Sequence, residues 1–191
     1  MPHYSFIRRI GFIVLIGLAV IWLSEAPAAQ LKPNGMHHQP WIKDQPKFVL
    51  KESLKQAEQA GKGLVILFEQ KGCVYCKALH EKNFTDKGLV EFITKHFNFL
   101  QLDLWGKRQV TLPGGETMAE QDYARSITVT NTPTALFLNA DGGVRFRLPG
   151  FAPAPVYQAA FEFVVEGGPE QNLSLMPWLR ERLKKKQAEG G

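Results

Sequence analysis

Cys73 and Cys76 are the only cysteines of this chain, and they lie three positions apart in the stretch GCVYC. Two thiols at this spacing can form a short disulfide, bind a metal ion, attach a haem or exchange disulfides with other proteins. A disulfide that closes so small a loop stabilises the fold by only about 2 kcal/mol, against about 4 to 5 kcal/mol for a loop of roughly a hundred residues. A purely structural role therefore explains the pair poorly.

The two alternatives that involve a bound group lack residues that they need. Covalent haem attachment requires a histidine directly after the second cysteine, where this chain has Lys77. Zinc requires two further ligands, and no histidine occurs at a spacing typical of a zinc site. We therefore expect no metal and no cofactor, and we interpret the histidines as structural. The candidates considered are His37, His38, His80 and His96.

Thiol–disulfide exchange explains the position of the cysteine pair as well as its spacing. The apolar run LVILFE at 64–69 predicts a buried strand, and a helix is expected to begin at Cys73. A cysteine at a helix N-terminus faces free N–H groups and the positive end of the helix dipole, which both favour the nucleophilic thiolate. Cys73 is thus the expected nucleophile, and Cys76 the thiol that resolves the mixed disulfide.

Strand and helix patterns alternate along most of the chain. They predict an α/β fold in which a mixed central β-sheet is flanked by helices on both faces. Residues 105–118, which contain Pro-Gly-Gly, predict an inserted loop or hairpin. Helices are predicted within 48–63, 73–81, 86–97, 119–127 and 152–168, and strands within 64–69, 98–104, 134–140 and 144–150.

Residues 1–28 predict a signal peptide or an N-terminal membrane anchor. Two arginines precede the apolar run 10–23, and Ala26 and Ala28 offer a cleavage site. The run is shorter than the roughly 20 residues of a typical spanning helix, which favours a cleaved signal. We therefore expect a periplasmic domain in an oxidising compartment. The expected organisation is an extended lead-in at 29–47, the globular domain at 48–170, and an amphipathic helix with a basic tail at 171–191.

The net charge does not indicate a polyanionic partner. The chain carries a formal charge of +5, and part of this excess lies in the C-terminal stretch RERLKKKQAEGG. Nucleic-acid binding requires a basic stripe with aromatic residues that stack on bases, and the sequence contains no such pattern. We expect no nucleic-acid partner, and we expect a monomer.

From 48 to 166 the sequence resembles the thioredoxin superfamily, and within it the secreted thioredoxin-like proteins associated with bacterial sulfur-oxidation (Sox) clusters. The resemblance rests on LVILFE, on GCVYC at the start of a helix, on NTPTALFLNADGG and on RLPGF. It implies a thioredoxin-like fold and a redox-active Cys73–Cys76 disulfide. It also implies a cis-proline at Pro133, with Thr132 and Pro133 as substrate-binding residues. We expect Tyr75, between the two cysteines, to contact the substrate as well.

Two features depart from the family pattern. Thioredoxins place a buried acid six residues before the first cysteine, where this chain has Leu67. Glu69, four residues before Cys73, is our candidate for proton transfer to or from Cys76, and the alternative is a strand-end glutamate that faces solvent. The Val-Tyr pair between the thiols lacks a histidine that would stabilise the thiolate. We therefore expect a potential nearer to the roughly −270 mV of thioredoxin than to the roughly −120 mV of a strong oxidant.

The expected function is that of a thiol–disulfide oxidoreductase that reduces protein disulfides. Its partners are expected to be disulfide-containing substrate proteins and a membrane electron donor of the thiol–disulfide type, because the outer compartment holds no thiol buffer. A thiol oxidase, an isomerase, a redox-inactive chaperone and a metal carrier on the same fold remain alternatives. The sequence leaves the substrate and the direction of electron flow open.

Overall fold

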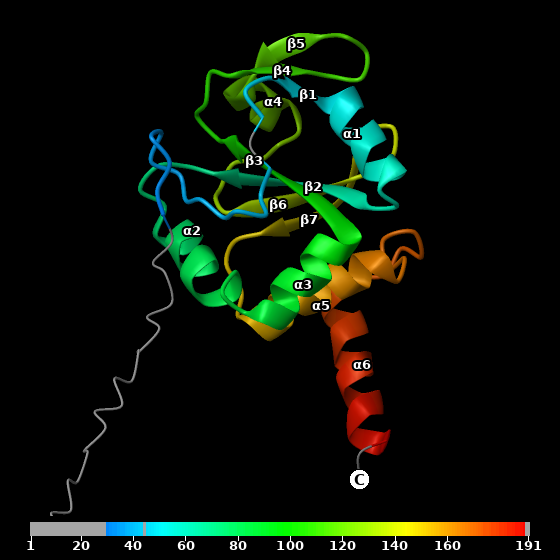
Figure 1. Ribbon diagram of the computed structural model, residues 1–191. Coiled ribbons are helices and arrows are strands. Elements are labelled where there is room, and N and C mark those ends of the chain that lie inside the picture. Colours follow the sequence, from blue (N-terminus) through cyan, green and yellow to red (C-terminus); the bar gives the residue numbers. More distant parts are fainter. Residues whose placement is uncertain (1–29, 44, 190–191) are drawn as a thin grey trace, which may run out of the picture.

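The computed structural model describes residues 30–43 and 45–189 (Figure 1), so the predicted signal or anchor at 1–28 lies outside the described residues. A four-stranded sheet forms the centre of the molecule, in the order β3-β2-β6-β7. Strand β2 runs parallel to β3 and antiparallel to β6, and β7 runs antiparallel to β6. These strands are β2 (Gly63–Glu69), β3 (Phe97–Asp103), β6 (Thr134–Leu138) and β7 (Val144–Pro149).

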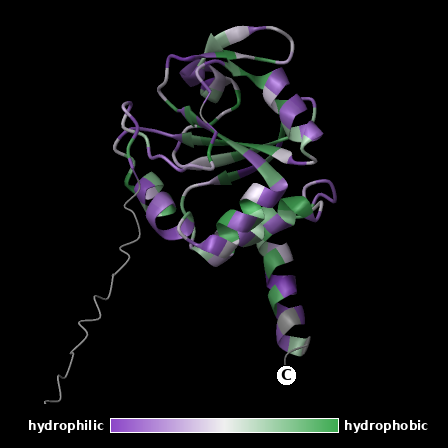
Figure 2. Cartoon of the chain, viewed as in Figure 1, coloured by the Kyte–Doolittle hydropathy of each residue, from purple (hydrophilic) through white to green (hydrophobic). Residues whose placement is uncertain are grey.

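Strand β2 contributes to both core layers, because successive side chains of a strand point to opposite faces of the sheet. Val65 and Leu67 pack in one layer, with residues of α3 (Lys87–His96) and α5 (Ala154–Val165). Ile66 and Phe68 pack in the other layer, with residues of α1 (Leu50–Gln59) and α4 (Glu120–Ser126). Figure 2 shows the central strands as mainly hydrophobic and α1 as mainly hydrophilic. The predicted mixed sheet with helices on both faces is confirmed.

The helix after β2 changes its winding part-way. Residues Val74–Ala78 form α2, and the chain continues without a break into a π-helical turn, η1 (Leu79–Asn83). The helix predicted over 73–81 therefore extends two residues further and widens over its second half. Single π-turns of this kind occur often at functional sites.

The insertion predicted at 105–118 contains a hairpin. Strands β4 (Gln109–Thr111) and β5 (Thr117–Ala119) pair antiparallel, and β1 (Phe48–Val49) adds to β4 in parallel, which forms a second, three-stranded sheet. Arg108 anchors the start of this unit: its guanidinium lies 2.6 Å from Glu120 Oε1 and donates to the Gln101 carbonyl at 2.9 Å.

The lead-in before β1 packs against the central sheet. The backbone N–H of Lys43 donates to the Phe99 carbonyl at 3.1 Å. The Trp41 ring packs edge-on against Phe84 and Phe99, at centroid distances of 4.9 and 5.2 Å. The side chain of Met36 is also buried. The lead-in is mostly irregular, as expected, but between residues 30 and 43 it is part of the folded domain.

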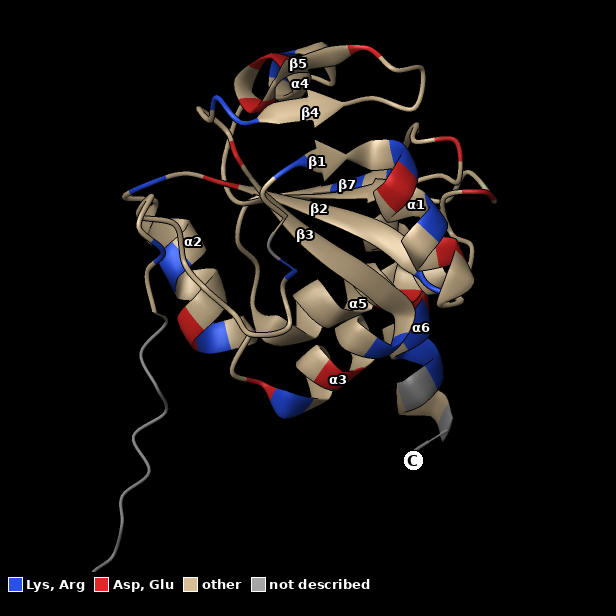
Figure 3. Cartoon of the chain, turned by 45° about the horizontal axis from the view of Figure 1, so that its top comes forward, with Lys and Arg blue, Asp and Glu red and all other residues tan. Residues whose placement is uncertain are grey.

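The C-terminal helix α6 (Leu175–Glu189) projects away from the body (Figure 1). Its Trp178 ring packs against Phe163 at 5.4 Å and lies beneath Arg182 at 5.0 Å, and Arg182 pairs with Glu162 of α5 at 3.2 Å. Figure 3 shows Lys and Arg residues gathered on α6, whereas the central strands carry few charged residues. Within 30–43 and 45–189, no helix is both long and apolar enough to cross a membrane.

Candidate active site

Cys73 and Cys76 form a disulfide at the junction between β2 and α2. Gly72, with a φ of +74°, allows the turn from the strand to the helix, because this region of backbone space is unfavourable for residues with a Cβ. Cys73 is the N-cap of α2, and its Sγ accepts the backbone N–H of Cys76 at 3.0 Å. Cys73 is 8% exposed and Cys76 is fully buried, so Cys73 is the outer cysteine of the pair, although it is less exposed than the sequence analysis expected of the nucleophile.

The loop before β6 supplies the second side of the site. The Thr132 hydroxyl donates to Sγ of Cys73 at 3.3 Å, and the peptide bond between Thr132 and Pro133 is cis. The Gly150 N–H donates to the Pro133 carbonyl at 2.7 Å, which holds the loop against β7. Among the described residues, no backbone group bonds the N–H or C=O of Thr132. Both groups are therefore free to pair with another chain.

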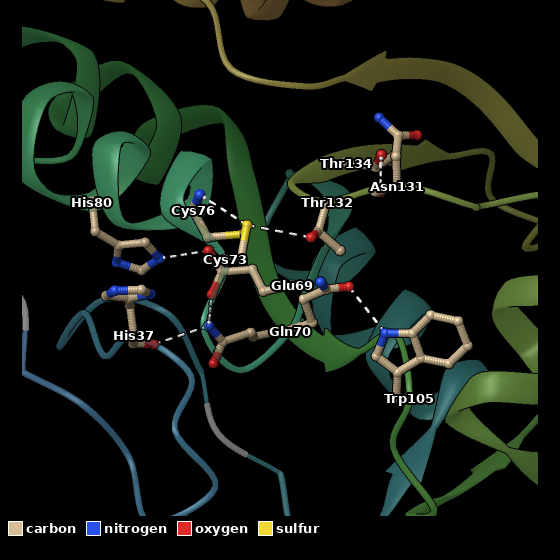
Figure 4. The surroundings of a disulfide bond; sticks show 11 residues. His37, Glu69, Gln70, Cys73, Cys76, His80, Trp105, Asn131, Thr132 and Thr134 are labelled. Atoms are coloured by element: carbon tan, nitrogen blue, oxygen red, sulfur yellow. Dashed lines mark hydrogen bonds and ion pairs between the residues drawn. A yellow bond between two sulfur atoms is a disulfide. The ribbon is translucent and has the colours of Figure 1, made fainter.

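Apolar side chains surround the disulfide at the protein surface. Val74, Tyr75 and Trp105 are 75%, 65% and 60% exposed. Trp105 comes from the inserted segment, and its indole N–H donates to Gln70 Oε1 at 3.0 Å. Figure 4 shows Gln70 between Cys73 and Trp105, so the insertion places an aromatic ring against Gln70, three residues before Cys73. Exposed aromatic groups of this kind are typical of protein-binding surfaces.

Glu69 is fully buried at the end of β2, and Figure 4 shows its carboxylate between the His80 ring and the cysteine pair. Its Oε1 lies 2.8 Å from Nε2 of His80, and its Oε2 accepts the side-chain amide of Gln101. The alternative of a solvent-facing glutamate is therefore wrong. Side chains two positions apart on a strand share a face, so Glu69 lies on the same face as Leu67, one step nearer to the helix that carries the cysteines.

Two histidines that the sequence analysis took as structural lie beside Glu69. His80 is fully buried on η1, and the His37 ring stacks on it at a centroid distance of 5.0 Å and an interplanar angle of 29°. The His37 carbonyl accepts the Gln101 amide at 2.9 Å. Burial lowers the pKa of His37 below its ordinary 6.5, and the neighbouring His80 lowers it further. Both histidine Nδ1 atoms are buried without a hydrogen-bond partner among the described residues.

His37, Glu69 and His80 are also the described residues that come nearest to a metal-ligand set, with ligand atoms within 4.8 Å of one another. Lone pairs of an imidazole lie in the ring plane, so two stacked rings direct them side by side and not to one point. Glu69 and His80 are moreover in direct hydrogen-bond contact at 2.8 Å. The geometry fits a hydrogen-bonded acid–histidine pair better than a metal site.

A family model for the thioredoxin-like domain matches residues 50–165, which is more than half of the chain. The chain belongs to the thioredoxin-like domain family. No curated protein sequence matches this chain closely enough to be counted as a relative.

Solved structures agree with this assignment. A thioredoxin-fold protein of Helicobacter pylori is 20% identical, covers 78% of this chain and 92% of its own, and has a TM-score of 0.58. A candidate disulfide isomerase of Bacteroides thetaiotaomicron is 28% identical, covers 66% of this chain and 94% of its own, and has a TM-score of 0.52. The predicted membership of the thioredoxin superfamily is confirmed, and the association with sulfur oxidation stays a prediction.

Sequence reasoning assigned no role to any of the three residues that contact Glu69 or its partners: His37 and His80 were interpreted as structural, and Gln101 was not a candidate. His80 follows Cys76 by four positions, a spacing that places two side chains on one face of a helix. That spacing was the signal from which a position of His80 near the cysteine pair could have been predicted. Gln101 and His37 reach the site from β3 and from the lead-in, and no local pattern marks either of them.

Proposed function

We propose that this protein is a thiol–disulfide oxidoreductase that acts on disulfide-containing proteins. The observation that carries the proposal is the pair of donors at Cys73: the Thr132 hydroxyl and the Cys76 N–H both point at its Sγ, at 3.3 and 3.0 Å. Hydrogen bonds to sulfur stabilise the thiolate that forms on reduction, which is the species that attacks disulfides. The buried Cys76 is suited to the resolving role.

In the proposed cycle, the Cys73 thiolate attacks a substrate disulfide, forms a mixed disulfide and releases one substrate thiol. The Cys76 thiol then gives up its proton and attacks Sγ of Cys73, which closes the Cys73–Cys76 disulfide and releases the second substrate thiol. The substrate disulfide is reduced by two electrons that the cysteine pair loses. Glu69 is the proposed acceptor of the Cys76 proton, because its carboxylate is buried between the His80 ring and the cysteine pair.

Thr132 and Tyr75 are the proposed substrate contacts. The free N–H and C=O of Thr132 can pair with an extended substrate segment as an added strand would, which supplies affinity without sequence specificity. Tyr75 and Trp105 offer exposed apolar area for contact with such a segment. The surface thus suits unfolded or exposed chain segments that carry a disulfide.

The proposed direction is reduction, in the periplasm, with electrons supplied by a membrane partner of the thiol–disulfide type. The absence of a histidine between Cys73 and Cys76 supports a reducing potential, nearer to the roughly −270 mV of thioredoxin. The likeness to a candidate disulfide isomerase favours isomerisation as the second candidate function. Equilibration with glutathione distinguishes reduction from isomerisation, because a redox potential of the Cys73–Cys76 pair above about −160 mV reverses the direction proposed here.

The proposed function is tested by trapping substrates in the native compartment. Cys76→Ser removes the resolving thiol, so mixed disulfides through Cys73 should accumulate and be released by dithiothreitol. The matched control, Cys73→Ser, should trap nothing. If neither variant traps a protein, and the reduced dithiol instead binds copper or zinc tightly, the carrier alternative is favoured and the oxidoreductase proposal fails.

A further inference from the structure

Glu69 and His80 make one hydrogen-bonded unit beneath the cysteine pair. Both side chains are 0% exposed, and 2.8 Å separates Oε1 of Glu69 from Nε2 of His80. The second carboxylate oxygen accepts the Gln101 amide, which leaves the carboxylate with a donor on each oxygen. A buried carboxylate without such donors would be strongly unfavourable. The fold supplies the carboxylate from β2 and its two donors from η1 and β3.

We propose that Glu69 and His80 act as a single proton-sharing pair that takes up the Cys76 proton during resolution, with His80 as the residue that positions and tunes Glu69. This inference rests on the proposed function and assigns a role to His80, which the proposed cycle does not use. Two titratable groups in such close contact take up protons as a pair and not as independent sites.

The surroundings of the pair restrict where the proton can go. The His37 ring stacks on His80, and the edge of the Phe84 ring faces His80 at 5.1 Å. Tyr157 is a further buried titratable group that Glu69 influences: burial and, to a smaller extent, Glu69 raise its pKa, so that it stays neutral. On the helix that carries the cysteines, Lys77 and Glu81 interact with each other near the surface at 3.8 Å.

The lead-in closes the pair off from solvent. Burial and the neighbouring His80 lower the pKa of His37, which disfavours a positive charge on the ring that stacks on His80. A Cβ at Gly35 would contact the Lys71 side chain at 2.8 Å, which shows how closely the lead-in approaches the turn before Cys73. A proton taken from Cys76 is therefore held by Glu69 and His80 and is not passed directly to water.

The proton step balances in both halves of the cycle. During resolution the Cys76 thiol gives its proton to the Glu69–His80 pair, and the resulting thiolate attacks Sγ of Cys73. When the thiol donor later reduces the Cys73–Cys76 disulfide, electrons from the donor regenerate the Cys76 sulfur as a thiolate, which takes a proton back from the pair. The pair thus returns to its starting state, and only the cysteines change oxidation state.

Stopped-flow reduction of Ellman's reagent by the reduced protein separates the two steps. A first equivalent of thionitrobenzoate reports attack by Cys73, and a second equivalent reports resolution by Cys76. The informative variants are His80→Gln, which keeps an N–H donor toward Glu69 but no titrating ring, and His80→Leu, which removes the donor as well. Glu69→Gln and the Glu69→Gln/His80→Leu double variant complete a double-mutant cycle.

We expect the ratio of the second to the first rate constant to fall at least about tenfold at pH 6 in His80→Gln, and to approach the wild-type ratio toward pH 9. The double variant should be no slower than Glu69→Gln, because the two residues act as one unit. A His80→Gln profile that superimposes on the wild-type profile, or additive effects in the double variant, overturns the proposal. Absence of the first phase in the wild-type protein would instead contradict the proposed function itself.

A measurement on the wild-type protein guards against variants that do not fold. The ring nitrogen resonances of His80 should shift at pH 7 when the disulfide is reduced, because the pair then exchanges a proton with Cys76. His96 on α3 lies outside the described contacts of the cysteine pair and serves as the internal control. Identical His80 resonances in the oxidised and reduced proteins overturn the proposal.

Discussion

The side-chain hydroxyl of Thr132 donates to Sγ of Cys73 across 3.3 Å, although the two residues are 59 positions apart in the sequence. The loop before β6 therefore contacts the Cys73 sulfur directly, and among the described residues the N–H and C=O of Thr132 have no backbone partner. One residue thus combines two roles in the proposed cycle: it stabilises the nucleophile and it offers the edge on which a substrate segment can pair.

Replacing Thr132 with Val should make Cys73 less reactive. The change removes the hydroxyl and keeps the β-branched shape, so the thiolate loses one hydrogen bond worth about 1 kcal/mol. We expect alkylation of Cys73 by iodoacetamide at pH 6 in the reduced protein to slow about fivefold. Thr132→Ser, which retains a hydroxyl, is the control and should stay close to wild type. Equal rates for the Val variant and the wild type would contradict this role for the hydroxyl.

Replacing Trp105 with Ala should weaken the binding of protein substrates. The indole is 60% exposed beside the cysteine pair, and truncation of an interface tryptophan commonly costs more than about 1 kcal/mol of binding energy. We expect the KM for a protein disulfide to rise at least about fivefold, while reduction of Ellman's reagent is unchanged. Leu183→Ala on α6 removes a similarly exposed apolar side chain and is the matched control. A rise in KM in both variants would indicate a general effect.

The stability of the protein should fall above pH 10 in part because of Tyr123. Burial raises the pKa of Tyr123 from 10.0 to about 12, although Arg147 lowers it somewhat. Below pH 10 both states hold the proton; between pH 10 and 12 the unfolded state loses it first, so the free energy of unfolding decreases. Between pH 8 and pH 11, the free energy of unfolding measured with urea should therefore fall by about 1 kcal/mol less in Tyr123→Phe than in the wild type.

The Phe variant is a suitable comparison, because the Tyr123 hydroxyl is buried without a hydrogen-bond partner among the described residues. At pH 8 the variant should therefore be close to wild type in stability. If the two proteins lose stability in parallel up to pH 11, Tyr123 does not contribute to alkaline unfolding.

Replacing Arg108 with Met should destabilise the fold, because it leaves the Glu120 carboxylate buried without its charge partner. The Glu120 side chain is 4% exposed and lies 2.6 Å from the Arg108 guanidinium. Breaking a buried ion pair by removing one partner costs about 3 kcal/mol, which urea unfolding can measure. The control is Arg125→Met, whose partner Asp122 lies at 2.8 Å on the surface, where such pairs contribute less than about 1 kcal/mol. Equal losses in the two variants would contradict this assignment.

Much of the fold could be predicted from the sequence, because the elements around the cysteine pair carry strong local signals. The run 64–69 is continuously apolar, as expected for a strand buried on both faces, and it forms most of β2. The Pro-Gly-Gly stretch within 105–118 indicated a hairpin, which β4 and β5 form. The π-turn at Leu79–Asn83 had no such signal, because its sequence also suits an ordinary α-helix.

By itself, the sequence determined the two thiols, their order along the chain and the strand and helix that flank them. Only the tertiary structure decided which groups surround Glu69. His80 and Gln101 reach it from η1 and β3, and His37 arrives from the lead-in. The physical reason is that local periodicity sets which face of an element a side chain occupies, whereas strand register and helix packing set which faces meet.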